Sequence, residues 1–488
     1  MITWAQVGRS GLRALVAAGF LAGCTVGPDY VPPRTEVPDL WEQELSRGLV
    51  DGQADLRTWW TALDDAELDR LIAQATEGNL DIRQAVARIR EARANLGIAG
   101  GELFPSVDGT GTVETSRVSN QVAEQLGPPQ SRTDTLYAVG LDATWEIDFW
   151  GRIRRNIESA DASIGASIED YRDTLVVLYA EVARNYVGMR TLQARIESAL
   201  DNVRAQRAAL QLTIDRNRAG LAPDLDVRQA ELNLATTQAF VPTLRSALAQ
   251  TINRLAVLLG EYPGALEAEL IEPAPIPQPP EEVMVSLPAE LLRQRPDIRS
   301  AERQLAAQTA QIGVATAELY PQFTLSGSFA FESFSFDNWI ETQARSFSFG
   351  PAFRWSIFDA GRIRSNIEAQ GALTEQALVS YEQTVLGAVE EVENAIAAYV
   401  QERDRLESLQ RSVVAARESV RLVETLYRTG LTDFQNVLDT QRSQFQQEDA
   451  LAESEGLVTQ NLIEVYRALG GGWAPEVAEP QEGSEKVT

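Results

Sequence analysis

Few residues of this chain have side chains suited to acid–base, nucleophilic or metal chemistry. Its 488 residues include no histidine and a single cysteine, Cys24. The lack of histidine removes the commonest general base and the commonest metal ligand. One cysteine can form neither an intramolecular disulfide nor a thiolate metal cluster. No carboxylates stand at ligand spacing and no phosphate loop or nucleophile elbow is found, so an enzyme remains conceivable only as a carboxylate hydrolase. The sequence predicts no catalytic residue, metal or cofactor.

The surroundings of Cys24 indicate a different chemistry, the attachment of lipid. Arg9 and Arg13 precede the apolar run 14–22, which is typical of a signal peptide and too short for a spanning helix of about 20 residues. The run ends in Leu21-Ala22-Gly23-Cys24, which resembles the bacterial lipoprotein cleavage box. An incidental or buried cysteine is the alternative. Because Thr25 rather than aspartate follows, we expect an acylated Cys24 and an anchor in the outer membrane.

A duplicated stretch organises the rest of the chain. Trp145–Ile157 reads WEIDFWGRIRRNI, and Trp355–Ile367 reads WSIFDAGRIRSNI 210 positions later. Glu102–Pro105 likewise matches Glu318–Pro321 at an offset of 216. A duplication on this scale predicts one architecture built from two halves. The net charge of −27 argues against nucleic acid or an anionic membrane surface as a partner.

Each half contains two segments in which apolar and polar residues alternate with period two, at 106–114 and 136–149 and at 322–332 and 347–358. Roughly 9–14 residues is the length that a tilted strand needs to cross a bilayer. A soluble sheet with one wet face gives the same alternation, but the lipoprotein start favours the membrane. Four strands cannot close a membrane barrel, because an open edge in lipid is prohibitive. The chain should therefore form an oligomer.

Very long helices should account for most of the remaining chain. The segments 151–219 and 361–429 lack proline, repeat apolar residues every seven positions and would each span about 100 Å as helices. Shorter return helices are expected at 224–260 and 433–469. Together with the helices before the strands, they would give each half two columns of equal length. The predicted fold is mainly α, with a transmembrane β part and long coiled-coil helices.

The expected organisation has six parts. They are a lipoprotein signal peptide at 1–23, an extended lipid-anchored segment at 24–58, a first structural repeat at 59–271, a proline-rich connector at 272–287, a second structural repeat at 288–470, and an acidic tail at 471–488.

The turns between the long and return helices carry matching residues in both halves. Gly220 and Gly430 are suited to left-handed helix stops, and Asp224 and Asp433 to the first turn of the next helix. Leu221, Leu431 and Phe434 are apolar residues expected to be exposed at these tips. Their repetition suggests an edge for docking a partner, whereas capping alone is the simpler interpretation of the glycines.

Several long stretches now give the chain a resemblance to the TolC-like outer membrane factors, in the lipoprotein branch that serves resistance–nodulation–division efflux pumps. The stretches are Leu21–Cys24 followed by Gly27–Pro33, then Leu287–Ser328 and Tyr427–Ser443. The resemblance covers nearly the whole chain except the acidic tail. It implies a homotrimer with a twelve-stranded barrel and a helical periplasmic tunnel. Its implied activity is that of a passive conduit that docks to a periplasmic adaptor and an inner-membrane pump.

The resemblance also suggests roles for single residues. By motif match, Asp439 falls on an acidic ring that constricts the closed tunnel, and Asn436 occupies a neighbouring position that is acidic in some members. Trp145 and Trp355 are expected near a bilayer interface, where tryptophan is favoured. The transported substrate stays open. The alternatives are the exit duct of a type I protein-secretion or metal-efflux system, and a coiled-coil lipoprotein that bridges envelope layers.

Overall fold

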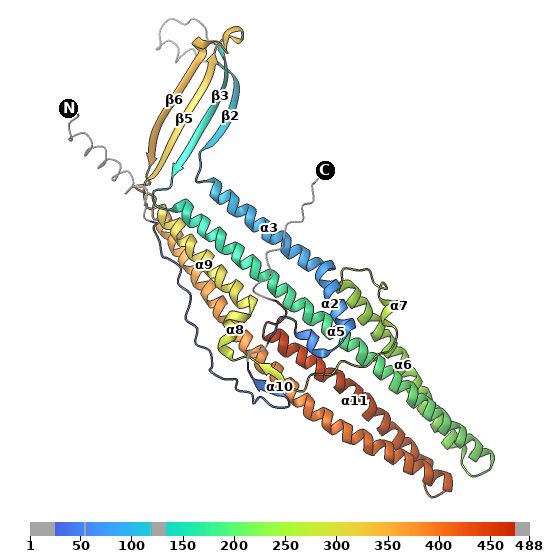
Figure 1. Ribbon diagram of the computed structural model, residues 1–488. Coiled ribbons are helices and arrows are strands. Elements are labelled where there is room, and N and C mark those ends of the chain that lie inside the picture. Colours follow the sequence, from blue (N-terminus) through green and yellow to red (C-terminus); the bar gives the residue numbers. More distant parts are fainter. Residues whose placement is uncertain (1–24, 53–54, 118, 120–132, 474–488) are drawn as a thin grey trace. The chain divides into compact units, whose positions relative to one another are not determined.

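The computed structural model describes residues 25–473, apart from 53–54, 118 and 120–132 (Figure 1). The predicted signal peptide, Cys24 and nearly all of the acidic tail lie outside the described residues. The described chain forms two compact units, each built from segments of both sequence halves. One contains 25–34, Ile89–Ser167 and Ala301–Tyr381, and the other contains Thr35–Arg88, Ile168–Ser300 and 382–473.

The first unit contains a four-stranded antiparallel sheet. Its strands are β2 (Ser106–Arg117), β3 (Thr133–Ile147), β5 (Gln322–Ser333) and β6 (Arg345–Arg354), in the order β2-β3-β5-β6. Two short 3₁₀ turns, η2 (Phe336–Asn338) and η3 (Thr342–Ala344), lie between β5 and β6. The predicted strands therefore all form, and the two halves contribute adjacent hairpins to one sheet.

The strand register separates two faces of the sheet. Leu141 stands opposite both Gly109 and Phe329, and Phe329 stands opposite Phe347. One position along, Asp142 stands opposite Asp108 and Ser328. Directly opposed residues of antiparallel strands point to the same side. The apolar sets of all four strands therefore share one face, and the polar sets share the other.

Two strands end earlier than predicted. β3 stops at Ile147 rather than Phe149, because Asp148 leaves the ladder to accept hydrogen bonds from the backbone amides of Ile153 and Arg154. β6 stops at Arg354 rather than Phe358, because its partner β5 begins at Gln322, which pairs with Arg354. The residues between each strand and the next helix thus form a corner rather than more strand.

The long helices form over nearly the expected residues. They are α5 (Arg152–Arg218) and α10 (Arg362–Thr429), with 67 and 68 residues. Shorter helices precede the strands, α3 (Leu80–Gly101) and α9 (Pro296–Ala317), and return helices follow the long ones, α6 (Asp224–Leu258) and α11 (Phe434–Ala468). In the described part of the chain, no helix combines the length and hydropathy needed to cross a membrane.

The second unit holds the greater lengths of α5 and α10 together with α6, α11 and several short elements. These are η1 (Trp59–Leu63), α2 (Ala66–Gly78), α7 (Glu267–Leu270) and α8 (Pro288–Gln294). The heptad positions Leu175, Val182 and Met189 are buried, as the seven-residue repeat predicts. A parallel pair, β1 (Leu49–Asp51) with β4 (Val283–Val285), joins the N-terminal segment to the proline-rich connector and was not expected from sequence.

The C-terminal end of the described chain is also held in this unit. The guanidinium groups of Arg172 and Arg299 lie over the ring of Trp473, at 4.7 and 5.1 Å from its centroid. The Trp473 indole donates a hydrogen bond of 3.0 Å to the carbonyl of Gln294. Two cations against one ring stabilise the segment by cation–π attraction, which fixes the point where the acidic tail begins.

Candidate functional site

The apolar face of the sheet exposes an unusual amount of aromatic surface. The side chains of Phe347, Phe349 and Phe353 on β6 are 82%, 77% and 69% exposed. The opposite face carries hydroxyl and carboxylate groups, for example the hydrogen bond between Thr110 and Asp142. A sheet with one apolar and one wet face can line a polar conduit while it presents its other side to lipid.

Both tryptophans predicted at the interface are fixed in the same way. The indole of Trp145 donates to the carbonyl of Leu103 over 2.8 Å, and that of Trp355 donates to the carbonyl of Leu319 over 3.0 Å. Both acceptors belong to the repeated turn before a strand. Each ring thus belongs to the apolar face while its polar atom is satisfied by the backbone, an arrangement suited to a membrane interface.

The Gly-Arg turns begin the long helices at the corners. Gly151 and Gly361 have φ angles of +80° and +89°, which favour glycine. Arg152 pairs with Glu146 at 2.9 Å and with Glu102 at 3.2 Å. These hydrogen bonds, above all that with Glu146, raise the pKa of the Arg152 guanidinium. Arg152 at the first corner therefore stays charged, and the carboxylates of Glu146 and Glu102 neutralise its charge.

The two helical tips close as the glycines predict. Gly220 and Gly430 have φ angles of +73° and +77°. The following amides of Leu221 and Leu431 donate back to the carbonyls of Arg216 and Leu426, over 2.8 and 2.9 Å. This six-to-one bond defines a Schellman stop. The leucine side chains are 67% and 75% exposed, so they are available at the tips.

The expectation that Phe434 is exposed at the tip is wrong. Its side chain is 2% exposed and packs in a cluster with Tyr427, Val437 and Leu438. The rings of Phe434 and Tyr427 lie 5.3 Å apart. Phe434 is the first residue of α11, and its burial against α10 closes the hairpin. It therefore stabilises the tip from inside and offers no surface to a partner.

The polar residues singled out near the tips lie on exposed helix surface. Asp433 caps α11 by accepting from the amide of Asn436 at 3.2 Å, and the Asn436 side chain donates to Thr432. Asp439 is exposed and accepts a hydrogen bond of 3.0 Å from Gln435. Asp224 is an exposed residue in the first turn of α6. The structure leaves these carboxylates facing solvent.

Sequence reasoning missed Arg216, which joins the two tips. Its guanidinium lies 4.6 Å from the ring centroid of Tyr427 and donates to the carbonyl of Arg428 over 3.0 Å. Asp226 is close by, and burial together with the nearby charge of Asp433 raises its pKa. The α5–α6 and α10–α11 hairpins are thus coupled at their ends by one cation. The signal available in the sequence was only an arginine four residues before a tip glycine.

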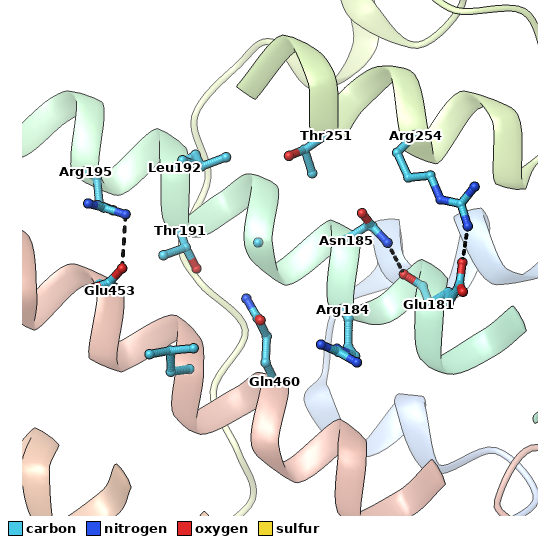
Figure 2. Close-up of a pocket in the computed structure, with 12 residues that line it drawn as sticks. Glu181, Arg184, Asn185, Thr191, Leu192, Arg195, Thr251, Arg254, Glu453 and Gln460 are labelled. Atoms are coloured by element: carbon cyan, nitrogen blue, oxygen red, sulfur yellow. Dashed lines mark hydrogen bonds and ion pairs between the residues drawn. The ribbon is translucent and has the colours of Figure 1, made fainter. Parts of the chain in front are cut away.

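A polar groove lies between α5, α6 and α11 in the second unit, with a volume of about 510 Å³. Figure 2 shows that charged side chains cross it: Arg195 pairs with Glu453, and Arg254 pairs with Glu181. Because its charges are already paired, the groove resembles a helix seam more than a ligand pocket. Among the described residues, no group of three or more acidic side chains is arranged to hold a metal ion.

Comparison with known proteins agrees with the two-faced sheet and the long helices. The profile of the family described as "Outer membrane efflux protein" matches residues 71–261 and 287–471. The chain belongs to the outer membrane efflux protein family. It is 32% identical to Nodulation protein T of Rhizobium leguminosarum bv. trifolii, over 93% of this chain and 96% of that protein. It is also 32% identical to the solvent efflux pump outer membrane protein SrpC of Pseudomonas putida, with the same coverage.

Solved structures give the same assignment. The outer-membrane channel OprN is similar with a TM-score of 0.84 and 37% identity, covering 94% of this chain and all of that chain. CusC is similar with a TM-score of 0.81 and 26% identity, covering 92% and 100%. The protein is therefore an efflux channel component of the outer membrane with a large periplasmic part. Channels of this family function as trimers with an adaptor and an inner-membrane pump, and they are not enzymes.

Proposed function

We propose that three copies of this chain form the exit duct of a tripartite pump for small organic compounds. The observation that carries the proposal is the register-aligned sheet, whose aromatic face suits lipid and whose polar face suits a water-filled pore. A single chain leaves the outer edges of β2 and β6 without a neighbouring strand in the described sheet. Three chains would supply twelve strands and pair every edge.

The cargo class rests on relatives rather than on a binding pocket. Relatives named for solvent and toluene efflux are each 32% identical to this chain. A cation efflux relative, CusC of Escherichia coli O157:H7, is 28% identical, so a metal-efflux duct is the second candidate. Deleting the gene should lower the tolerated concentration of organic solvents and lipophilic drugs at least fourfold. Sensitivity to metal cations without sensitivity to these compounds would support the second candidate.

Conductance tests the channel itself. Purified protein in a planar lipid bilayer should give discrete, cation-preferring current steps, because the wet sheet face carries carboxylates such as Asp108 and Asp142. The protein should also migrate as a heat-modifiable trimer from outer membrane fractions. A protein that stays monomeric and gives no steps would be an envelope-bridging lipoprotein rather than a channel.

The tips are the proposed docking edge for the periplasmic adaptor. Gly220, Leu221, Asp224, Gly430, Leu431 and Asp433 form it, with the two exposed leucines as apolar contacts and the glycines and aspartates as the fixed turns. Exposed apolar residues at corresponding places in both hairpins suit a partner that repeats around a ring. Replacing both leucines by serine should abolish adaptor capture while it leaves the conductance steps unchanged.

Asp439, with Asn436 beside it, is the proposed periplasmic gate. In a trimer, three exposed Asp439 carboxylates would concentrate negative potential at a constriction and bind cations. Asp439→Ala should weaken block of the current by divalent cations about tenfold, or about 1.4 kcal/mol. Glu375→Ala, which removes an exposed carboxylate on α10 in the other unit, is the control. Equal block in both variants would remove Asp439 from the gate.

Acylation of Cys24 completes the proposal. It rests on the apolar run and the Leu-Ala-Gly-Cys box, because the cysteine itself lies outside the described residues. The mass of the mature N-terminal peptide should show an acylated cysteine, and Cys24→Ser should lack it.

A further inference from the structure

The residues that follow Cys24 are bound at the first corner. The amide of Val26 donates to the carbonyl of Trp150 over 3.1 Å. A Cβ added to Gly151 would lie 2.7 Å from the side chain of Thr25. The N-terminal segment 25–29, here called the strap, therefore lies directly against the corner within one compact unit.

Arg155 holds the strap in place. Its side chain is only 4% exposed, and it donates to Asp29 over 2.6 Å and to the carbonyl of Val26 over 3.2 Å. A further bond of 2.7 Å joins it to Glu158. Burial alone would lower the pKa of this guanidinium, but the bonds to Asp29 and Glu158 raise it. A buried cation with these partners is costly to leave unpaired, so the strap completes the site.

Glycines make room for this contact. Gly27 has a φ of +91°, and a Cβ there would overlap the Cα of Gly313 on α9. A Cβ on Gly313 would in turn lie 2.7 Å from Cγ of Arg155. The strap, α9 and the start of α5 therefore meet at backbone distance. Packing this close indicates that the strap is firmly held against the corner.

The N-terminal end of the strap, at Thr25, lies beside an aromatic cluster on the apolar face. Trp150 stacks on Tyr320 at 4.6 Å and meets Phe149 edge-on at 5.4 Å. Phe149 lies 5.8 Å from Phe323, which lies 6.3 Å from the exposed Phe353. Thr25, the first described residue, lies against Gly151 beside this cluster, and it is the residue to which Cys24 is bonded. Acyl chains on Cys24 would therefore start next to this cluster.

We propose that the first corner is a cradle for the acylated N-terminus, in which Arg155 positions the strap and the aromatic cluster receives the acyl chains. The inference rests on the proposed acylation of Cys24. The second corner lacks the parts for a cradle. At the positions equivalent to Phe149, Trp150 and Arg155 it has Asp359, Ala360 and Ser365. A Cβ on Gly361, or on Gly97 at the position equivalent to Gly313, would meet nothing within 4 Å.

Hydrogen–deuterium exchange of the full-length trimer tests whether Arg155 holds the strap. Arg155→Ser, which introduces the residue of the second corner, should raise exchange in peptides covering residues 25–34 by about tenfold or more. Asp29→Asn should have a smaller effect of the same kind, and it does not endanger folding because Asp29 is 86% exposed. Arg364→Ser on the exposed second corner is the matched control and should change nothing. Unchanged exchange in both variants, Arg155→Ser and Asp29→Asn, would show that Arg155 does not hold the strap.

Photocrosslinking tests the destination of the acyl chains. Phe149 is replaced by p-benzoylphenylalanine in cells fed an alkynyl palmitate, and the second-corner equivalent Asp359 is replaced in the same way as a control. Irradiation should attach the labelled acyl peptide to position 149, with at least tenfold less at position 359. Equal yields at both positions, or none at 149, would overturn the cradle. An unacylated Cys24 in the mass spectrum would overturn the cradle too, whereas only bilayer conductance bears on the channel.

Discussion

The two corners differ more than their sequences suggest. Both turn a strand into a long helix at a left-handed glycine, Gly151 or Gly361, and both fix a tryptophan to the preceding turn. The first corner is covered by the strap and carries the buried Arg155. In the single chain the second is open, with Ile357 and Phe358 almost fully exposed.

A duplicated motif can thus acquire two roles within one chain. Repetition preserved the turn itself, because any strand-to-helix corner needs the glycine and a helix cap. It did not preserve the side chains around the turn, because only one N-terminus exists in each chain. The open corner uses two successive left-handed residues, with Ala360 at φ +56° before Gly361. That conformation is more strained for alanine than for glycine.

The largest expected difference in stability is between alanine substitutions at two equivalent glycines, Gly313 on α9 and Gly97 on α3. Gly313→Ala should lower stability by about 1–3 kcal/mol, because its Cβ would press on the held side chain of Arg155. Gly97→Ala at the equivalent position should cost less than Gly313→Ala, because in the single chain its Cβ would meet nothing within 4 Å. Thermal unfolding followed by circular dichroism measures both. Similar shifts for the two variants would show that the corners are packed alike.

The next effect concerns the caps. The Asp148 side chain is only 7% exposed and accepts from two backbone amides and from the side chain of Arg154. Asp148→Ala should therefore cost about 2 kcal/mol in thermal unfolding. Asp359→Ala should cost less, because the partly buried Asp359 accepts from the amides of Gly361 and Ile363 but has no side-chain bond like the one that Arg154 gives Asp148. A larger loss for the second variant would contradict the comparison.

Acid should distinguish the Asp359 cap further. Hydrogen bonds from the backbone amides of Ile363 and Gly361 lower the pKa of Asp359. A lowered folded-state pKa adds stability above the ordinary value of about 4, and this stability is lost as pH falls through the folded value. The difference in unfolding midpoint between the unsubstituted protein and Asp359→Ala should thus be present at pH 7 and vanish in strong acid. If the difference in unfolding midpoint did not change with pH, the Asp359 carboxylate would not stabilise the helix as a cap.

The smallest expected effect concerns the tryptophans. Phenylalanine at either position keeps an aromatic ring but removes one indole hydrogen bond, worth about 1 kcal/mol. Trp145→Phe should lower the unfolding midpoint more than Trp355→Phe, since Trp355 is 51% exposed and water or headgroups can replace its partner. The two variants can be compared in one detergent. Equal losses would mean that both corners are equally shielded.

Sequence patterns alone predicted the strands, apart from two of their ends, together with the long helices and the tip glycines. Period-two and heptad patterns are local signals. They predicted a strand at 322–332, and in the structure β5 spans Gln322–Ser333. Left-handed stops at Gly220 and Gly430 also depend on neighbouring residues alone. The family resemblance added the channel function, which the comparisons confirmed.

Which side chains are covered depends on packing between distant segments of the chain. Phe434 looked exposed because tips usually are, but α10 places Tyr427 against it. Arg216 and Arg155 gained their partners from segments 212 and 126 residues away in the chain. The short β1–β4 pair likewise joins segments with no pattern of their own. Long-range contacts depend on how elements meet in space, and so the duplicated corner could be recognised in the sequence while its two environments could not.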